Sequence, residues 1–415
     1  MTEAGARPRV RTIVVLGLLS TFGPLSLDLY LPALPQLADE LGASTSAAQL
    51  SITACLVGLA TGQLVAGPLS DRFGRRRPLL VGLVAYLMAS LACGFASTIS
   101  VLLTLRLVQG LAGAAGLVIA RAVARDLYEG RTLVLFFSRL ILISGLAPVI
   151  APVLGGQLSK MMSWRGIFVV LAGFGLALLC AGIFGVRETL PADRRTRGGL
   201  GTTLHGFVVL LKDRLFVGAA LSSGLAGASM FAYIAGATFV LQRIYGLSPV
   251  GFSLAFGANS LGIMTAGQIG GRLARGWSAP RVLALGLLVN LVGAAGLAAT
   301  VVVSLGLPFL LGSLFVMVSA VGLVFPTATA LAMADYPNQA GAASSLLGLG
   351  QYFAGAVAAP LVGIAGEGSA VPLGLVALGA SVCAGAVFST MVYPAVRARR
   401  VLPEPPGGDP GSTLA

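Results

Sequence analysis

"GPLSDRFGRRRP", residues 67–78, places one Asp and four Arg among Gly and Pro, with long apolar segments on both sides. The surrounding chain has 415 residues, of which 56% are hydrophobic and 10% charged, and its mean hydropathy is +0.93. Soluble domains carry about 25% charged residues, so this composition indicates a membrane protein. Charge gathered between two apolar segments therefore predicts a loop that joins two membrane-spanning helices.

Apolar runs of about 20 residues, the length of a membrane-spanning helix, recur along the chain. We expect helices because backbone groups in lipid must bond within their own segment, and the alternating strands of a membrane barrel are not seen. The expected spans are 12–34, 47–68, 79–97, 100–122, 133–157, 167–186, 215–241, 250–273, 281–304, 308–333, 341–365 and 370–394. We interpret the first as a retained span, since Asp28 and Pro32 interrupt its end and it has no clear A-x-A-like cleavage site.

Lys and Arg are distributed unevenly among the connections. The net charge is +13, and if the spans alternate, nearly all cations fall on one side, while Lys160, Arg165 and Arg243 fall on the other. The positive-inside rule places the richer side, with both termini, in the cytoplasm. We expect a multi-pass protein of the cytoplasmic (inner) cell membrane that contacts lipids. A nucleic-acid partner is disfavoured, since no basic patch with interleaved aromatics occurs.

The polar connection 188–214 divides the spans six and six. We expect an N-terminal six-helix bundle over 1–187, a cytoplasmic linker over 188–214, a C-terminal six-helix bundle over 215–396 and a disordered cytoplasmic tail over 397–415. A faint repeat supports the two halves, because GQLVAGPLSDRFGRRRPLLVG (62–82) resembles GQIGGRLARGWSAPRVLALG (267–286). Transporters built from two such halves bind substrate between them near the midplane. The fold class is thus all-α and integral to the membrane, with two pseudo-symmetric bundles.

The opening motif is similar to the G-x-L-x-D-R-x-G-R-R/K loop signature of the major facilitator superfamily. LDLYLPALPQLADEL (27–41), LRLVQGLAGAAGLVIARAVARDLYEG (105–130) and APVIAPVLGGQL (147–158) resemble its Bcr/CflA drug-resistance branch, which includes bicyclomycin and chloramphenicol exporters. The resemblance covers most of the first half, and the second half by topology only. It implies the major facilitator fold and drug:proton antiport, with the proton as coupling ion and no other cofactor. We expect a monomer.

Asp28 is the acidic residue that lies well inside a span. Placing an ionisable group inside a membrane costs free energy, so such a residue is first considered as a functional one. Burial favours the neutral carboxyl and a nearby Arg favours the charged one, so Asp28 could bind and release a proton. Pro32 leaves the Asp28 carbonyl without its helical donor and predicts an irregular patch beside the acid. The alternative is a structural Asp28 paired with an Arg.

Arg106 is the expected partner of Asp28, and the resemblance assigns it a role in proton transfer. A snorkelling or purely structural Arg106 is the alternative. Gln109, Gly110 and Gly113 share its helix face, where glycine lets a helix or ligand approach. We assign to the substrate cavity Tyr30, Gln109, Gly110, Gly113, Phe231 and Tyr233, although aromatics in spans more often face lipid or core.

Asp71 could pair with Arg125 or Arg121 and hold the cytoplasmic side closed, the gating role that the resemblance implies. Arg75, Arg76 and Arg77 are fully explained as topology determinants that contact anionic lipids. In the fifth span Pro and Gly recur on one face, where they bend the helix and permit close packing, as in the superfamily's antiporter motif. The expected gating residues are Gly67, Asp71, Arg72, Gly74, Arg125, Gly145, Pro148, Pro152, Gly155 and Gly156. Arg139 has no functional explanation.

The predicted function is proton-coupled efflux of small amphipathic drugs by alternating access. An enzyme is not expected, because no P-loop and no nucleophile–base or metal constellation occurs, and the four Cys have no partners at metal-ligand spacing. Three alternatives stay open. They are an exporter of an endogenous metabolite such as a sugar or amino acid, a proton-coupled importer, and a channel or receptor.

Overall fold

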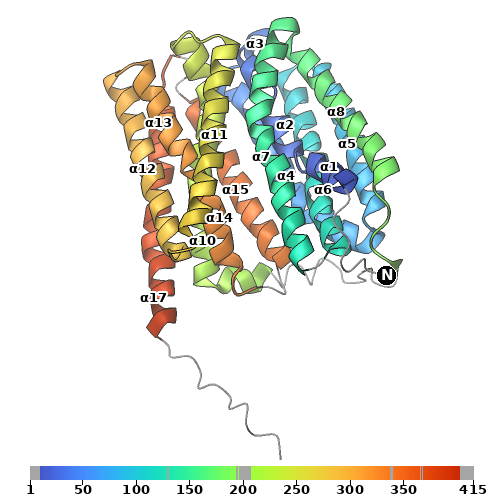
Figure 1. Cartoon of the computed structure of the whole chain (residues 1–415). Helices are drawn as coiled ribbons and strands as arrows, with labels where there is room; N and C mark the ends of the chain where they lie inside the picture. The colour runs from blue at the N-terminus through green and yellow to red at the C-terminus, as the bar shows by residue number, and fades with distance from the viewer. Residues whose placement is uncertain are drawn as a thin grey trace, which may run out of the picture.

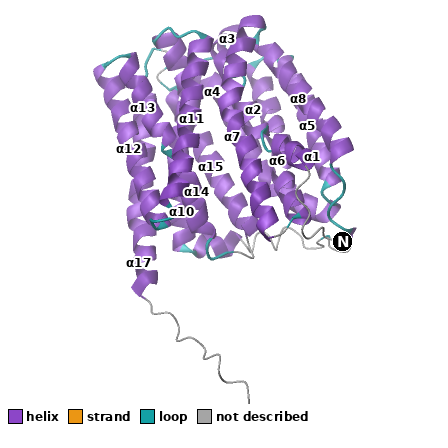
Figure 2. Cartoon of the chain, in the orientation of Figure 1, coloured by secondary structure: helices purple, strands orange, loops and turns teal. Residues whose placement is uncertain are grey.

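A computed structural model describes residues 10–401, apart from 129, 193–194, 196–206, 337–339, 365 and 367. Within these ranges every regular element is a helix and no strand occurs, as Figure 2 shows. The predicted tail 397–415 and the linker 188–214 lie partly outside them. The all-helical class predicted from composition is confirmed.

The first half forms one broken helix followed by five continuous ones (Figure 1). These elements are α1 (Val10–Leu19), α2 (Phe22–Asp28), η1 (Leu31–Ala33), α3 (Leu34–Glu40), α4 (Thr45–Phe73), α5 (Arg76–Gly94), α6 (Ile99–Leu127), α7 (Gly130–Met161) and α8 (Trp164–Gly185). We call them the N-terminal bundle. Each coincides with an expected span to within a few residues, except the first.

The second half repeats this pattern, with local irregularities in three spans. Its elements are α10 (Arg214–Phe239), η3 (Val240–Ile244), α11 (Pro249–Leu273), α12 (Ala279–Val303), α13 (Leu307–Ser319), α14 (Val321–Met333), α15 (Ala340–Val362), α16 (Val371–Val387), η5 (Phe388–Val392) and α17 (Tyr393–Val401). We call them the C-terminal bundle. The segments η3 and η5 are π-helical turns that continue α10 and α16.

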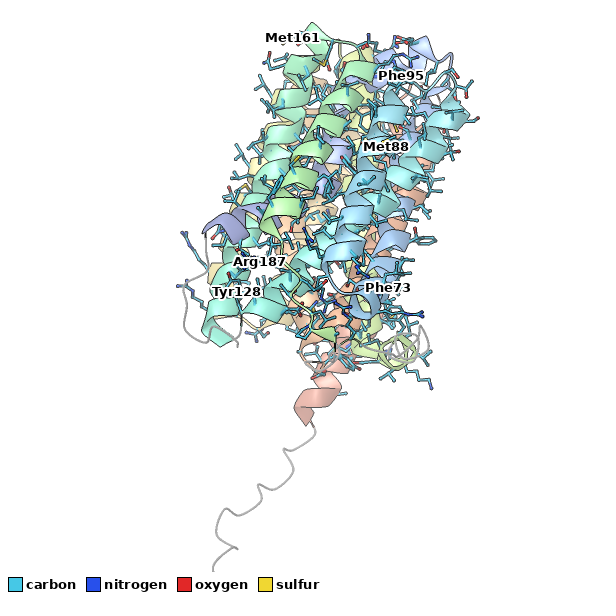
Figure 3. All side chains as sticks on the ribbon, turned by 90° about the vertical axis from the view of Figure 1, so that its right-hand side faces the viewer. Phe73, Met88, Phe95, Tyr128, Met161 and Arg187 are labelled. Carbon is cyan, nitrogen blue, oxygen red and sulfur yellow. The ribbon has the colours of Figure 1, made fainter. Side chains whose placement is uncertain are left out.

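The helices meet the length and apolarity of membrane spans. Among the described residues ten helices do so alone, and the pair Thr12–Leu19 and Phe22–Glu40, bent by 44°, makes an eleventh. The expected span 133–157 lies in α7, several of whose side chains are outside the described set. Large apolar side chains project from the periphery, among them Met88, Phe95 and Met161, which are 58%, 75% and 80% exposed (Figure 3). Such exposure suits a lipid surface, since soluble proteins rarely leave apolar patches of this extent.

Close helix crossings within each bundle depend on small residues. A Cβ added at Gly58 would lie 2.2 Å from the Leu107 carbonyl oxygen, and one at Gly110 would lie 2.2 Å from the Cys55 carbonyl oxygen. These two glycines therefore let α4 and α6 approach backbone to backbone. The bundles meet along two seams, α4 with α15 and α7 with α11.

The two ends of the molecule differ in charge. One end carries the α4–α5 loop and α17, and we call it the basic end; Arg72, Arg75, Arg76 and Arg77 lie in this loop or in the helix ends beside it. The opposite end carries α3, and we call it the α3 end. Figure 1 shows α3 at the top and α17 at the bottom.

The first span is interrupted beside its acid. Helix α2 ends at Asp28, and a 3-10 turn over Leu31–Ala33 follows, with Pro32 within its first two positions. The Ala33 N–H donates to the Tyr30 carbonyl oxygen at 2.9 Å rather than continuing an α-helix. The irregular backbone predicted from Pro32 is confirmed.

Hydrogen bonds inside the bundles support the internal repeat. Ser26 of α2 and Tyr86 of α5 join their hydroxyls at 2.7 Å. In the C-terminal bundle, the Asn290 amide on α12 donates to the Ser229 hydroxyl on α10 at 3.2 Å. In both halves the bond joins the first span to the third, so one polar contact recurs at matching places.

Candidate functional site

Asp28 lies between the bundles, and its side chain is turned away from the N-terminal bundle to which it belongs. It is 5% exposed, and within the described part of the chain its carboxyl has no hydrogen-bond or ion-pair partner. The groups that interact with it electrostatically are the hydroxyls of Tyr233 on α10 and Tyr352 on α15. An acid from one bundle therefore faces two tyrosines from the other.

Arg106 lies in the interior of the N-terminal bundle and is fully buried. Its guanidinium donates to the Ser26 carbonyl at 2.9 Å and the Ser51 carbonyl at 3.3 Å, and it lies 4.5 Å from the centre of the Tyr30 ring. One of its nitrogens, Nη2, has no hydrogen-bond partner.

The expected pairing of Arg106 with Asp28 does not form. Arg106 contacts residues 26 and 30, which are one turn apart on the same face of the first span. At about 100° per residue, position 28 points to the opposite side. The residues that attract Arg106 therefore direct Asp28 towards the C-terminal bundle.

Four residues expected in the substrate cavity instead belong to the N-terminal core. The Tyr30 hydroxyl bonds to the Ser51 hydroxyl at 2.9 Å, and the Gln109 amide donates to Ser90 at 2.7 Å. Gly110 faces α4, and Gly113 faces the Tyr86 ring. The glycines admit neighbouring helices rather than a ligand, which is the commoner use of small residues in membrane helices.

Phe231 and Tyr233 lie on the C-terminal side of the seam. The Tyr233 hydroxyl accepts a 2.8 Å hydrogen bond from the Asn259 amide, and its ring stacks on Phe256 with centroids 5.3 Å apart. Phe231 pairs with the Tyr352 ring at 6.1 Å. Sequence reasoning missed Asn259 and Tyr352, since uncharged polar residues in spans carry a weaker signal than ionisable ones.

Arg75 is the centre of a buried network at the basic end. It is 8% exposed, donates to Asp126 at 2.9 Å and to Ser70 at 2.8 Å, and forms an ion pair with Asp71. Its interpretation as a topology determinant alone is therefore wrong. Burial would lower the pKa of the Arg75 guanidinium, but the hydrogen bonds to Asp126 and Asp71 outweigh burial and raise it.

Asp71 pairs with neither expected partner. Arg125 is exposed, and Arg121 has no ion pair within the described set. Asp71 instead pairs with Arg75, which lies four residues later in the chain. The sequence did carry a signal for Asp126 that was overlooked. An acidic residue at an end of the molecule rich in arginine is unusual, and this pointed to an ion pair.

Two further residues expected to act in gating lie near this network. A Cβ added at Gly67 would lie 3.9 Å from Val118 Cγ1, which is ordinary contact with α6. The Arg72 guanidinium lies 5.3 Å from the centre of the Phe73 ring. Neither residue joins the hydrogen bonds of Arg75, so the structure gives both a packing role.

Glu188 fastens the start of the linker to this network. Its carboxylate accepts hydrogen bonds from the Arg75 N–H at 2.8 Å and the Arg76 N–H at 3.2 Å, at the N-terminus of α5. Burial would raise the pKa of the Glu188 carboxyl, but the backbone N–H groups of Arg75, Leu190 and Arg76 outweigh burial and lower it. Gly74 has a φ of +85°, and an added Cβ would lie 2.4 Å from Glu188 Oε2. This turn therefore needs glycine.

The glycines of the fifth-span motif permit close packing, as predicted. A Cβ at Gly155 would lie 2.0 Å from the Leu29 carbonyl oxygen, and one at Gly156 would lie 2.2 Å from Ser253 Oγ on α11. The Pro148 carbonyl accepts a 2.9 Å hydrogen bond from Ser260 on α11. The surroundings of Gly145 and the side chain of Arg139 lie outside the described residues.

Polar contacts join the bundles at the α3 end. The Gln242 amide donates to the Pro32 carbonyl at 3.1 Å, and Arg243 forms an ion pair with Asp39. The Gln49 amide donates to the Ala235 carbonyl at 3.2 Å. Sequence reasoning noted Arg243 only as a cation on the side of the membrane with few Lys and Arg residues, since its partner Asp39 lies about two hundred residues away in the chain.

Comparison with known proteins places this geometry among transporters. The family model described as Major Facilitator Superfamily matches residues 16–359. The uncharacterized MFS-type transporter YdgK of Bacillus subtilis is 40% identical over 372 residues, covering 89% of this chain and 92% of the relative. The bicyclomycin resistance protein homolog of Haemophilus influenzae is 30% identical over 382 residues, covering 92% and 94%. The chloramphenicol resistance protein of Pseudomonas aeruginosa is 32% identical over 290 residues, covering 70% and 68%.

Solved structures show the same fold at low sequence identity. A bacterial homologue of the human lysosomal transporter Spinster superposes with a TM-score of 0.73 at 15% identity, covering 95% of this chain and 98% of that one. The nucleoside transporter NupG gives a TM-score of 0.75 at 13% identity, covering 92% and 98%. These likenesses concern the arrangement of the helices alone.

Proposed function

This chain belongs to the Major Facilitator Superfamily, and on that premise we propose that it exports small amphipathic drugs in exchange for protons. It is a multi-pass membrane protein of a transporter family. The drug part of the proposal is supported by relatives named for resistance to bicyclomycin and chloramphenicol, which align with most of its length.

The proposed orientation places the basic end in the cytoplasm. The arginines around the α4–α5 loop and those of α17 lie there. The positive-inside rule assigns such an end to the cytoplasm. The α3 end then faces outward across the cytoplasmic membrane.

The observation that carries proton coupling is the Asp28 carboxyl between the bundles, which has no ion-pair or hydrogen-bond partner among the described residues. A carboxyl with no permanent counter-charge can change protonation as its surroundings change. One pH unit supplies about 1.4 kcal/mol per proton, and the membrane potential supplies about 2.3 kcal/mol per charge per 100 mV. Protons moving inward through Asp28 could therefore drive drugs outward without ATP.

The proposed cycle alternates access to Asp28. In this structure Gln242, Arg243 and Gln49 join the bundles at the α3 end, which supports a state closed to the outside. Rocking of the bundles would part these contacts, admit a proton to Asp28 and release the drug. Return to the present state would close Asp28 off from the outside, so that the proton leaves towards the cytoplasm.

The test uses Asp28→Asn, which keeps the shape and removes the titratable group. We expect it to abolish uphill, pH-driven export in everted vesicles for a panel that includes chloramphenicol and bicyclomycin. Asp28→Glu should retain part of the activity, and both variants should insert and purify like the wild type. Full export by Asp28→Asn would refute the coupling role, and a wild-type chain that moves no drug in the panel would refute the substrate class.

A further inference from the structure

Each seam between the bundles has a helix-interior proline whose freed carbonyl faces the opposite bundle. Pro360 lies inside α15, and Pro152 lies inside α7. Because proline has no N–H, the carbonyl four residues earlier loses its helical donor. The carbonyls freed in this way belong to Ala356 and Pro148.

Each freed carbonyl accepts a hydrogen bond from a hydroxyl of the opposite bundle. Thr53 Oγ1 on α4 donates to the Ala356 oxygen at 3.2 Å, across the seam from α15. Ser260 Oγ on α11 donates to the Pro148 oxygen at 2.9 Å, across the seam from α7. The two seams are equivalent under the internal repeat, since α4 and α11 are second spans while α7 and α15 are fifth spans.

The helix backbones also approach closely on both seams, about two turns nearer the α3 end than the two bonds. A Cβ at Gly156 would lie 3.0 Å from the Pro249 carbonyl oxygen, and one at Gly363 would lie 2.9 Å from the Ser46 backbone nitrogen. Gly156 follows Pro152 by about one turn, and Gly363 follows Pro360 likewise. Glycine thus brings the helices together about two turns nearer the α3 end than the carbonyls that proline frees.

The Ser260 bond can break at little cost. A hydroxyl has one hydrogen to donate, and besides the Pro148 oxygen it has a second acceptor, the Phe256 oxygen of its own helix at 3.1 Å. When the seam opens, Ser260 can turn back to Phe256, a common arrangement for serine in membrane helices. Water that enters the opened seam can donate a hydrogen bond to the Pro148 carbonyl in its place.

We propose that Thr53 and Ser260, with the carbonyls freed by Pro360 and Pro152, form a pair of latches that hold the α3 end closed and release when it opens. The latches set the balance between the two states of the transporter. The inference rests on the proposed alternating access, and it requires neither a particular drug nor proton coupling.

The test measures that balance directly, without drug or proton gradient. Spin labels on Met161→Cys of α7 and Val303→Cys of α12, both at the α3 end and exposed, report the distance between bundles by pulsed electron resonance. Cys180 and Cys383 are replaced by Ala, while Cys55 and Cys93 are buried and stay. A longer-distance population marks an opened α3 end.

Thr53→Val and Ser260→Ala should each raise the ratio of open to closed populations roughly threefold, and together about eightfold. The reason is that an interhelical hydrogen bond in a membrane protein contributes about 0.6 kcal/mol on average, which corresponds to a threefold change in a ratio of populations. Thr61→Val and Thr265→Val are the matched controls, because these hydroxyls on α4 and α11 bond only to their own helices. Thr53→Ser keeps the donor and should behave as the wild type. Equal effects of test and control variants would overturn the proposal.

A second variant tests the role of proline. Pro360→Ala restores an N–H that can bond to the Ala356 oxygen within α15, so Thr53→Val should add little in that background. If Thr53→Val has its full effect there, proline does not create the latch. Because all these populations are read from purified protein, loss of the latch and loss of drug export are separate outcomes.

Discussion

Asp28 and Arg106, the two ionisable residues with proposed roles in coupling, are separated by the geometry of one short helix. Ser26 and Tyr30 bring Arg106 against the N-terminal face of the first span, and Asp28 points the other way. Arg106 therefore stabilises the N-terminal bundle, while Asp28 meets Tyr233 and Tyr352 of the C-terminal bundle. A buried acid without a local counter-charge can respond to movement of the opposite bundle.

Arg106→Lys tests this division of roles. We expect it to lower the free energy of unfolding in detergent by about 2–3 kcal/mol, because an ammonium cannot bond to the Ser26 and Ser51 carbonyls at once while lying flat on Tyr30. Denaturant titration of the purified variant gives the value, with Arg77→Lys as an exposed control. An unchanged unfolding midpoint would show that the guanidinium fork is dispensable.

At the scale of elements, helix ends and helix interruptions carry the candidate machinery. The N-terminus of α5 is held by Glu188, which lies 113 residues from Arg75 in sequence. A carboxylate suits this place, since the first N–H groups of a helix lack partners and carry partial positive charge. The linker is thereby fastened to the N-terminal bundle through Arg75, Asp126 and Thr189.

Glu188 should make stability depend on pH. Its pKa is lowered in the folded protein, so its contribution is present above the unfolded value of about 4.3 and is lost as pH falls through the lower, folded value. Below about pH 4, the wild type should lose thermal stability faster than Glu188→Gln, while near neutral pH the wild type should be the more stable. Melting curves of both proteins from acid to neutral pH measure this, and parallel curves would contradict it.

At the scale of the whole molecule, the bundles touch through contacts between distant parts of the chain. The ion pair between Asp39 and Arg243 and the bond from Gln242 to Pro32 join the first span to the irregular end of the seventh. The π-helical turn η3 carries both donors. Closure at the α3 end thus combines an exposed ion pair with the partly buried hydrogen bonds of Thr53 and Ser260.

Removing the Arg243 charge should favour the opened α3 end. Arg243→Gln should raise the open population by up to about fivefold at low salt, the range for exposed ion pairs. High salt should diminish the effect, because screening already weakens the pair. The spin-label distance between residues 161 and 303 gives the populations, and Asp39→Asn should add nothing to Arg243→Gln. Full additivity would mean that the pair does not contribute to closure.

Much of the architecture follows from local sequence. The expected spans lie within a few residues of the observed helices because about 20 apolar residues in lipid have no alternative to a helix. Pro32 marked the break after Asp28, and Gly155 and Gly156 marked close packing, since both effects depend on the residue itself. Arg75 was misjudged because its neighbours Arg76 and Arg77 look the same in sequence, and only the fold brings Asp126 beside one of them.

The amino-acid sequence by itself determined the membrane class, the helical spans, the two halves and the acid within the first span, because hydrophobic length, charge and proline act locally. Only the tertiary structure decided that Arg106 turns inward, that Asp28 faces Tyr233 and Tyr352, and that Thr53 and Ser260 reach carbonyls of the other bundle. The physical reason is that lipid supplies no hydrophobic force between helices. Their arrangement therefore depends on small residues and hydrogen bonds between segments that are far apart in the chain.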